Sequence, residues 1–346
     1  MKLSAHRDES APAERAFWKR AARPSWPPYD LLEEDVAARA RARLDKIERL
    51  YHVGQDQAWD GRAVLDALIE KHGPPRLDPE RRAAAMRILS VLLWGELAAW
   101  AISADLAEHI DHVEAKMAAT SQAHDEARHF YVLRDYCRAL GEPVPRLGGI
   151  GRRLLIGILE TDSLVHKLIG MQLLVESNAL AIFRALAAAN VEPVLCELLP
   201  YYEKDEARHV GLGVLYLPRL LRRLTKVEAM AAAGFQLRCL ALLMSAGMTM
   251  RDDFRVLGVD PRRMAEHTVK LQDEIVREMF GGAAAAGSRA DGRDAVRGVL
   301  NPRVSVGPAI LDFVHPPGGE EAAPPWHRAA LALWTRGAAL ADRALS

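Results

Sequence analysis

The sequence is poor in several features, and each shortage argues against a class of protein. It has only three cysteines, Cys137, Cys196 and Cys239, far apart and without a CxxC pair. Neither a disulfide framework nor a cysteine-based zinc or rubredoxin site is therefore indicated. Lysine plus arginine equals aspartate plus glutamate, 46 of each. This zero balance gives no support to a nucleic-acid partner or an acidic membrane, although a local charged patch stays open.

Long uncharged hydrophobic runs are also missing. The N-terminal segment is charged and lacks the apolar stretch of a signal peptide, so a cytoplasmic location is predicted. The two most apolar stretches, 88–110 and 234–250, are interrupted by charged residues such as Glu96 and Arg238. We expect soluble core helices there rather than membrane spans, and no membrane partner.

Hydrophobic residues make up 50% of the chain but aromatic residues only 6%, with alanine, leucine and arginine abundant. This balance favours helix over sheet, because alanine and straight-chain residues lose little conformational freedom in a helix. We therefore predict an all-α fold. Helices are expected near residues 30–52, 58–72, 78–108, 111–140, 161–190, 193–224, 225–250, 260–280 and 325–345.

Three regions are predicted from this pattern. Residues 1–79 form an N-terminal arm, up to about residue 29, and two accessory helices. Residues 80–225 form a four-helix bundle. Residues 226–346 supply further accessory helices, with a flexible Gly/Ala/Pro-rich connection or lid near 281–322.

A duplicated motif inside the bundle carries the chemistry. In the first half, Glu96 on one predicted helix is followed by Glu126 and His129 on the next. The second half repeats the same spacing with Glu176, Glu206 and His209. The local string DEARH is identical at 125–129 and 205–209.

The spacing predicts two helical hairpins. Residues three apart lie on one helix face, so Glu126 and His129 can address one ion. Glu96 and Glu126 are 30 residues apart. This length takes the chain from the middle of one helix, through a short turn, to the middle of an antiparallel neighbouring helix. Two hairpins packed together would gather four carboxylates and two imidazoles, a donor set that suits iron or manganese. The metal ligands are predicted to be Glu96, Glu126, His129, Glu176, Glu206 and His209.

The connection between the hairpins adds a constraint. If they are related by a two-fold axis, the chain must cross the bundle between residue 140 and the third bundle helix. A third helix that began at Arg152 would leave a loop too short for this, because an extended chain spans only about 3.5 Å per residue. We therefore expect a separate crossover helix at 152–160 and a new start near the N-cap cluster Thr161-Asp162-Ser163.

The aspartates of the two DEARH strings are predicted to orient the histidines, since a ligating histidine usually donates its other ring N–H to a carboxylate. Asp125 could serve His129 on its own helix, but the opposite hairpin is an equally natural target. We predict the crossed pairs, Asp125 with His209 and Asp205 with His129. Arg128 and Arg208 should compensate the buried aspartates.

Further candidates lie within one helical turn of these ligands. Glu203 precedes Glu206 by three residues and is a candidate extra ligand or proton carrier, although an exposed glutamate is the commoner case. A substrate cavity would be shaped by neighbouring side chains. The pocket candidates are Trp100, Gln122, Phe130, Gln172, Ala179, Leu180, Tyr202 and Val210.

The E…DExRH…E…DExRH arrangement resembles the ferritin-like non-haem di-iron carboxylate superfamily over residues 80–225. Its form is similar to that of bacterial multicomponent monooxygenases, epoxidases of aromatic CoA thioesters and acyl-carrier-protein desaturases. The resemblance implies two iron ions (or an Mn/Fe pair) and O2 as co-substrate. It also implies a small organic substrate and a ferredoxin or reductase as electron donor. A homodimer is expected.

Three positions depart from patterns in that superfamily. Leu133 stands where ribonucleotide-reductase small subunits carry a radical tyrosine. Leu180 replaces the threonine of several hydroxylases, and Tyr202 replaces an additional histidine ligand of arylamine N-oxygenases. These departures argue against a stored tyrosyl radical and leave the substrate open.

The function expected from the resemblance is an O2-activating oxygenase or oxidase, acting by hydroxylation, N-oxygenation, desaturation or oxidative cleavage. One alternative is a ferroxidase, an iron-storage protein or a rubrerythrin-like peroxide scavenger. Ferritins are shorter chains, and rubrerythrins usually add a cysteine-rich domain that is absent here. A bundle that only binds ligands, with a vestigial metal site, is a third reading that the intact motifs disfavour.

Overall fold

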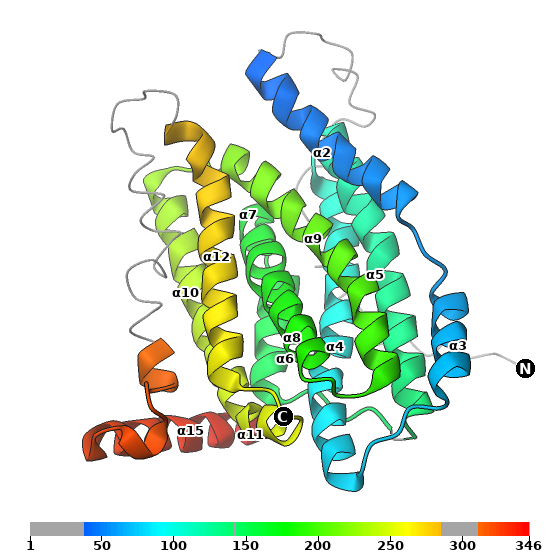
Figure 1. The fold of residues 1–346 in the computed structure, drawn as a ribbon. Helices are drawn as coiled ribbons and strands as arrows, with labels where there is room; N and C mark the ends of the chain where they lie inside the picture. Colours follow the sequence, from blue (N-terminus) through cyan, green and yellow to red (C-terminus); the bar gives the residue numbers. More distant parts are fainter. Residues whose placement is uncertain (1–37, 142, 285–310, 346) are drawn as a thin grey trace, which may run out of the picture. The chain divides into compact units, whose positions relative to one another are not determined.

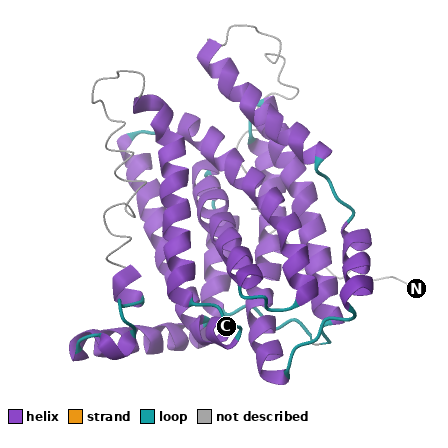
Figure 2. Cartoon of the chain, viewed as in Figure 1, coloured by secondary structure: helices purple, strands orange, loops and turns teal. Residues whose placement is uncertain are grey.

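The computed structural model describes residues 38–141, 143–284 and 311–345, and every regular element in these ranges is a helix (Figure 2). The all-α prediction is confirmed for them. The predicted arm at 1–29 lies outside the described residues. The elements, labelled in Figure 1, are α2 (Ala38–Asp56), α3 (Gly61–His72), α4 (Pro79–His109), α5 (Val113–Ala139), α6 (Gly149–Leu159), α7 (Leu164–Leu168), η2 (Ile169–Val175), α8 (Glu176–Ala188), α9 (Pro193–Leu221), α10 (Lys226–Thr249), α11 (Arg251–Val256), α12 (Pro261–Ala284), η3 (Glu320–Ala322) and α15 (Pro325–Leu345).

Two helical hairpins form the bundle. The first pairs α4 with α5, and the second pairs the continuous α7–η2–α8 helix with α9 (Figure 1). The hairpins meet where α5 packs on α9 and α4 packs on α7 and η2. Accessory helices surround this unit, with α2 and α3 against α5 and α9, and α12 against α8 and α9.

The starts of the bundle helices follow from local sequence. Asp78 caps α4 by accepting from the backbone N–H groups of Glu80 and Arg81, and Pro79 occupies the first helical position. Ser163 caps α7 through the N–H of His166. The capping oxygens satisfy N–H groups that have no partner inside the helix. The third bundle helix therefore starts at the N-cap cluster, as predicted.

The predicted crossover helix is present as α6. It begins at Gly149, slightly earlier than expected, because Asp342 of α15 accepts from the N–H of Ile150 at 2.8 Å and caps the helix from outside. On its inner side, Ile158 packs against Gly170 of η2. A Cβ at position 170 would lie 2.7 Å from the Cγ1 of Ile158. This glycine allows the crossover helix to lie close to the bundle.

The third bundle helix is not a regular α-helix, contrary to expectation. Its segment Ile169–Val175 is a π-helix, and the N–H of Glu176 bonds to the carbonyl of Met171, five residues back. The carbonyl of Leu173 accepts from the Ser177 hydroxyl and from the Gln272 amide of α12. The extra residue in this turn changes the direction in which the following side chains point.

Hydrophobic residues pack in two large clusters that lie on either side of the polar side chains. One cluster contains hydrophobic residues at positions 98–106 of α4, and the other contains those at positions 84–93. Glu96 lies between them along α4. In α5, Glu126 and His129 likewise lie between the first cluster's Ala119 and the second cluster's Val132. The core therefore holds a polar layer with apolar packing above and below.

Some accessory elements differ from expectation. A short helix, α11, follows α10 almost directly, and Pro218 lies inside α9 just before its end. Of the segment expected to be flexible near 281–322, residues 281–284 belong to α12 and 320–322 to η3. Its middle part lies outside the described residues. The three-region division remains a prediction.

Three helices are long and apolar enough to cross a membrane by length and composition, namely Pro79–His109, Leu164–Ala188 and Lys226–Thr249. The most apolar windows of the first two are 61% and 72% buried within the protein, but that of the third is only 28% buried. The first two therefore serve as core helices of the bundle. The expectation of no membrane partner stays a prediction, and α10 is an apolar helix with an exposed side.

Candidate metal centre

The six predicted ligands meet in the polar layer of the bundle. They come from α4, α5, α8 and α9, and every one of them is at most 4% exposed. Their donor atoms form two groups in which all atoms lie within 4.8 Å of one another. The groups are Glu96, Glu126, His129 and Glu206, and Glu126, Glu176, Glu206 and His209.

Glu126 and Glu206 belong to both groups, whereas the other four residues belong to one each. The first group adds Glu96 and His129, and the second adds Glu176 and His209. A shared carboxylate has two oxygens and can bridge two ions. The arrangement is that of two adjacent cation sites with two common carboxylates.

Several potential metal-binding atoms of the cluster converge on one another. Nδ1 of His129 lies 3.4 Å from a carboxylate oxygen of Glu96, 3.4 Å from one of Glu126 and 3.3 Å from one of Glu206. That Nδ1 atom and Oε2 of Glu126 are buried without a hydrogen-bond partner. Buried polar atoms left unpaired are costly, so their convergence fits a cation between them.

The outer ring nitrogens of both histidines contact the aspartates of the opposite hairpin. Nε2 of His129 lies 3.0 Å from Oδ2 of Asp205, and Nε2 of His209 lies 3.3 Å from Oδ2 of Asp125. These are the crossed pairs predicted from the sequence, and they hold each ring with Nδ1 facing the cluster. The local alternative, Asp125 serving His129 on α5, is not formed.

The two arginines tie these aspartates together. Nη2 of Arg128 donates to Asp125 at 2.5 Å and to Asp205 at 2.8 Å, and Nη2 of Arg208 donates to Asp205 at 2.6 Å and to Asp125 at 3.0 Å. Each guanidinium thus spans both hairpins. Their two positive charges balance the two buried aspartates, as expected, so the surroundings of the cluster are neutral overall.

Trp59, which sequence reasoning missed, joins this network from the loop between α2 and α3. Its Nε1 donates to Oδ2 of Asp205 at 2.8 Å, and the guanidinium of Arg128 lies 4.8 Å from the centre of its ring. Trp59 lies outside the duplicated segment, and no motif marks it. Only the packing of the accessory segment on α9 reveals it.

Two pocket candidates instead hold the cluster in place. Nε2 of Gln122 donates to Glu126 and to Glu176, at 3.1 Å each, and its own oxygen lies 3.4 Å from the amide of Gln172. The Tyr202 hydroxyl donates to the carbonyl of His129 at 2.8 Å, and its ring stacks on the imidazole at 4.4 Å between centroids. Both residues position ligands.

The other pocket candidates do not form an open substrate cavity. Trp100 is 41% exposed, so its role in shaping a substrate cavity stays a prediction. Phe130, Ala179, Leu180 and Val210 pack into the hydrophobic clusters. The cavity that borders the site beside Gln122 and His209 has a volume of only about 10 Å³, which is space for one water molecule.

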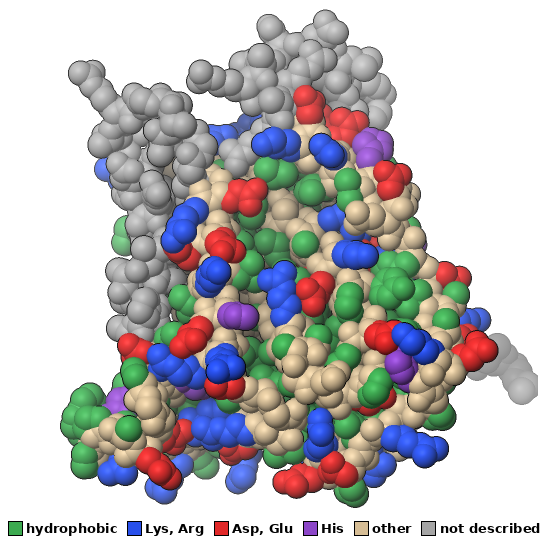
Figure 3. Space-filling model, viewed as in Figure 1, with side chains coloured by type: hydrophobic (Ala, Val, Ile, Leu, Met, Phe, Trp, Pro, Cys, Tyr) green, Lys and Arg blue, Asp and Glu red, His purple; other side chains and the backbone are tan. Residues whose placement is uncertain are grey.

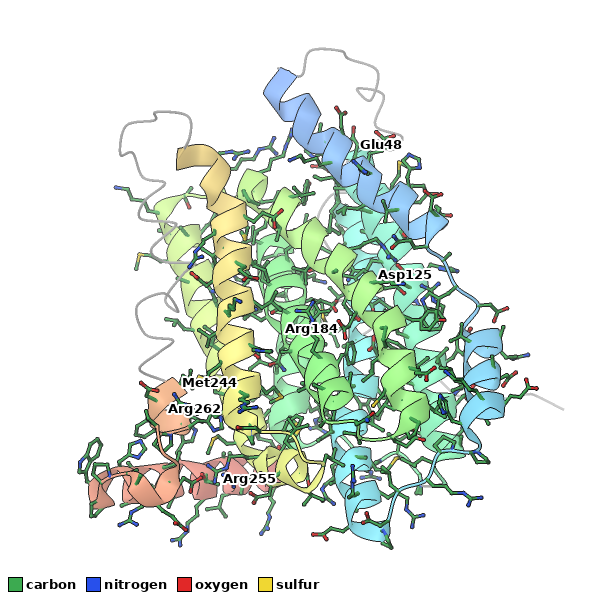
Figure 4. The ribbon with its side chains drawn as sticks, in the orientation of Figure 1. Glu48, Asp125, Arg184, Met244, Arg255 and Arg262 are labelled. Atoms are coloured by element: carbon green, nitrogen blue, oxygen red, sulfur yellow. The ribbon has the colours of Figure 1, made fainter. Side chains whose placement is uncertain are left out.

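Glu203 does not reach the cluster either. Its carboxylate pairs with Nε of Arg184 on α8 at 3.2 Å, and the side chain is 25% exposed. Figure 4 labels Arg184 on α8 and Asp125 on α5. The prediction of a seventh ligand at Glu203 is therefore wrong, and its commoner role as a surface glutamate holds.

Burial and mutual repulsion set the protonation of the metal-free cluster. Burial raises the pKa of Glu96 and of Glu176 well above the usual range, and neighbouring glutamates add to the rise. Burial alone would lower the pKa of His129, but the hydrogen bond to Asp205 and the nearby carboxylates of the cluster glutamates raise it well above its usual value. Without cations the cluster therefore retains protons, which divalent ions would displace.

Comparisons with known proteins bear on the fold. No family model and no curated protein matches the sequence. Solved R2-like ligand-binding oxidases match the structure. One point mutant with an anaerobically reconstituted Mn/Fe cofactor gives a TM-score of 0.53 at 16% identity over 67% of this chain and 93% of that chain. Another with an aerobically reconstituted Mn/Fe cofactor gives 0.52, again at 16% identity and with the same coverage of both chains. The chain therefore has the all-α, ferritin-like fold of R2-type proteins.

Proposed function

We propose that this protein is a non-haem di-metal oxidase that uses O2 to oxidise a small organic molecule. The observation that carries the proposal is the pair of overlapping donor groups with Glu126 and Glu206 in common. One metal ion would be held by Glu96 and His129, the other by Glu176 and His209, with the shared glutamates between them.

The donor set fits two divalent cations. Four ionised glutamates carry four negative charges, which two divalent ions balance, and both imidazoles are neutral ligands. Oxygen and imidazole donors suit iron and manganese, so two Fe ions or an Mn/Fe pair satisfy the same residues. The unpaired Oε2 of Glu126 and Nδ1 of His129 would then have partners.

The six residues would hold the two metal ions, which in reduced form would supply electrons to dioxygen. The residues of this chain have supporting roles. Asp205 and Asp125 fix the orientation of the imidazoles and increase their basicity. Gln122 donates to both Glu126 and Glu176 and so fixes their relative position. The apolar clusters on both sides of the polar layer exclude water. Ionised glutamates stabilise the higher oxidation states by their negative charge.

The structural neighbours support this assignment. Both are named as ligand-binding oxidases with Mn/Fe cofactors, and a further point mutant, at a TM-score of 0.50, is described with an Fe/Fe cofactor. The proposal for this chain goes further than the shared fold and rests on its own six residues. A ferredoxin or reductase as electron donor, a homodimer and a cytoplasmic location are part of the same proposal.

One observation favours a second function, the oxidation of iron itself. The cavity of about 10 Å³ beside His209 has no room for an organic molecule. Ferrous ions and dioxygen are small enough to enter without a large cavity. An organic substrate would instead require movement of side chains such as Gln122 or of helix α2, which borders this cavity through Leu50.

The test is to load metal-free protein with Fe(II) without oxygen, mix it rapidly with O2, and follow oxygen consumption and absorbance. Wild-type protein should react much faster than free Fe(II), and Glu126→Ala should react no faster than free Fe(II). Glu203→Ala is the matched control and should behave as wild type. Equal rates for Glu126→Ala and wild type would overturn the proposal, and continued oxidation of many irons per chain would indicate the second function.

A further inference from the structure

Large exposed hydrophobic side chains are concentrated on three helices outside the bundle. Among the described residues, nine large hydrophobic side chains are exposed, and seven of them belong to α6, α10 and α15. These three helices contact one another. The seven are Ile156, Val227, Met230, Leu237, Trp326, Leu333 and Leu340.

Helix α15 carries the most regular of these arrangements. Trp326, Leu333 and Leu340 are spaced seven residues apart, so they lie along one side of the helix, and they are 69%, 74% and 66% exposed. The opposite side, with Leu331 and Ala338, is buried. Hydrophobic side chains gather at the outer end of α15, at the lower left of Figure 3. We name this exposed stripe the outer face of α15.

Positive charge borders the outer face. Arg336 and Arg343 are exposed and follow the stripe along one flank, and Arg328 lies near the start of the helix. The single acidic residue of α15, Asp342, is already used to cap α6. Within the described residues none of the three arginines has an ion-pair partner. The helix is therefore amphipathic, basic and apolar on its outer side.

A second basic feature lies at the C-terminal end of this helix. A cavity of about 310 Å³ opens between α6, α10 and α15, next to Leu345. Three arginines, Arg152, Arg153 and Arg238, line it together with one acidic residue, Glu160. None of the three arginines forms an ion pair with a described residue, so the lining has an excess of positive charge. Arg238 is held over the Phe235 ring, 5.3 Å from its centre. The three guanidinium groups are thus available to an anion such as a phosphate.

We propose that the outer face of α15 docks this protein onto an anionic phospholipid surface, contrary to the expectation from the sequence of no membrane partner. Tryptophan and leucine would enter the boundary between headgroups and acyl chains, and the flanking arginines would contact lipid phosphates. The cavity lined by Arg152, Arg153 and Arg238 would accept a headgroup beside it. This local arrangement explains how a chain of zero net charge presents a cationic, apolar surface.

Charge distinguishes this occupant from a second copy of the chain. Packing two outer faces together would bring the arginine flanks of both copies close, with no exposed acidic residue on α15 to pair with them. Phosphate groups of lipids provide the opposite charge over the whole surface. The lipid surface therefore matches both the apolar stripe and its flank.

The test measures sedimentation of the full chain with sucrose-loaded vesicles. Vesicles of phosphatidylcholine alone are compared with vesicles that also contain phosphatidylglycerol. The protein should bind the anionic vesicles and be released by high salt. Because each arginine near an anionic surface contributes roughly fivefold to binding, Arg336→Ala with Arg343→Ala should weaken it by about 25-fold. The same double variant should bind neutral vesicles about as weakly as the wild-type protein does.

Substitutions in the stripe complete the test. Leu333→Glu and Trp326→Ser should abolish binding, whereas Leu333→Phe should retain it. All three variants change solvent-exposed sites, so folding, followed by circular dichroism, should be unaffected. Trp100→Ser is the matched control, since it removes an exposed tryptophan from α4. Failure of wild type to bind anionic vesicles, or unchanged binding of Leu333→Glu, would overturn the proposal. So would a change in molecular mass of Leu333→Glu without lipid, because that would assign the stripe to a second copy.

Discussion

Trp59 and Asp205, 146 residues apart, form a hydrogen bond in which the indole Nε1 donates to the carboxylate at 2.8 Å. The same oxygen, Oδ2, lies 3.0 Å from Nε2 of His129. An accessory segment thus contacts the candidate metal centre through one aspartate. The orientation of the His129 ring depends on a residue outside the bundle.

Replacement of Trp59 should therefore affect more than local packing. Trp59→Phe keeps an aromatic ring but removes the donor to Asp205, and loss of this partly buried hydrogen bond to a carboxylate should cost about 1–3 kcal/mol. Urea unfolding of the metal-free protein measures this change. Trp100→Phe, at an exposed site, should change stability by no more than about 0.5 kcal/mol. Equal effects of the two substitutions would show that the Trp59–Asp205 contact is not formed.

Metal counting should separate shared ligands from unshared ones. Glu96 belongs only to the first donor group, so Glu96→Ala should weaken one site and leave about one tightly bound metal per chain. Glu126 belongs to both groups, so Glu126→Ala should weaken both. Equilibrium dialysis with Fe(II) under nitrogen, followed by metal analysis, gives the number of bound metal ions per chain. If both variants retained the same amount of metal, Glu126 would not be shared.

The repeat made much of this site predictable. Identical spacing in two halves placed six polar side chains at one depth in four helices, and the need to cross the bundle predicted α6 between them. The crossed pairs of Asp125 with His209 and Asp205 with His129 follow from the same symmetry. Local spacing was less informative at Trp100. It lies about one helical turn after Glu96 on nearly the same face of α4, yet its ring is 41% exposed, so spacing along a helix does not by itself decide burial.

The stability of the metal-free protein should fall as pH rises above about 4.5, the ordinary pKa of a glutamate. Burial first, then neighbouring carboxylates, raise the folded-state pKa of Glu96 and Glu176. For His129 and His209, hydrogen bonds and nearby glutamates outweigh burial and raise the pKa. Each group binds a proton more tightly when folded, so its stabilising contribution is complete below its unfolded pKa. That contribution is lost as pH rises through the folded pKa.

Groups whose pKa is lowered in the folded state affect stability at acidic pH instead. For Glu126 and Asp205, nearby histidines outweigh the effect of burial and lower the pKa, so their contribution is lost only as pH falls below about 4. Thermal unfolding of metal-free and Fe(II)-loaded protein, recorded anaerobically across this range, tests the prediction. The loaded protein should gain stability with rising pH, because metal binding displaces protons. Parallel curves for both forms would contradict this account.

Two glycines provide a test of the crossover packing. Gly170→Ala would place a Cβ 2.7 Å from the Cγ1 of Ile158, and this overpacking should cost about 1–3 kcal/mol. Gly234 in α10 has open space around it, so Gly234→Ala should stabilise the helix by about 0.5–1 kcal/mol. Thermal unfolding of both variants should show a loss of stability for Gly170→Ala and a gain for Gly234→Ala. Stabilisation by Gly170→Ala would show that α6 lies farther from η2.

The features that the sequence did not reveal depend on contacts between distant segments. The π-helix at Ile169–Val175 is accompanied by a hydrogen bond from Gln272 of α12, far along the chain, and no local pattern marks it. No local pattern marks Trp59 either, because it lies outside the repeat and contacts Asp205 from a distant segment. Glu203 satisfied the spacing rule for a ligand, but a partner on α8, Arg184, holds it at the surface. Spacing defines a helix face, whereas tertiary packing decides which residues on it reach the centre.

Anomalous X-ray diffraction at the iron edge, from crystals loaded with Fe(II) without oxygen, tests the central claim most directly. Two anomalous peaks per chain are predicted, one beside Glu96 and His129 and one beside Glu176 and His209, with Glu126 and Glu206 between them. A single peak, or peaks away from these six residues, would contradict the assignment of a di-metal centre.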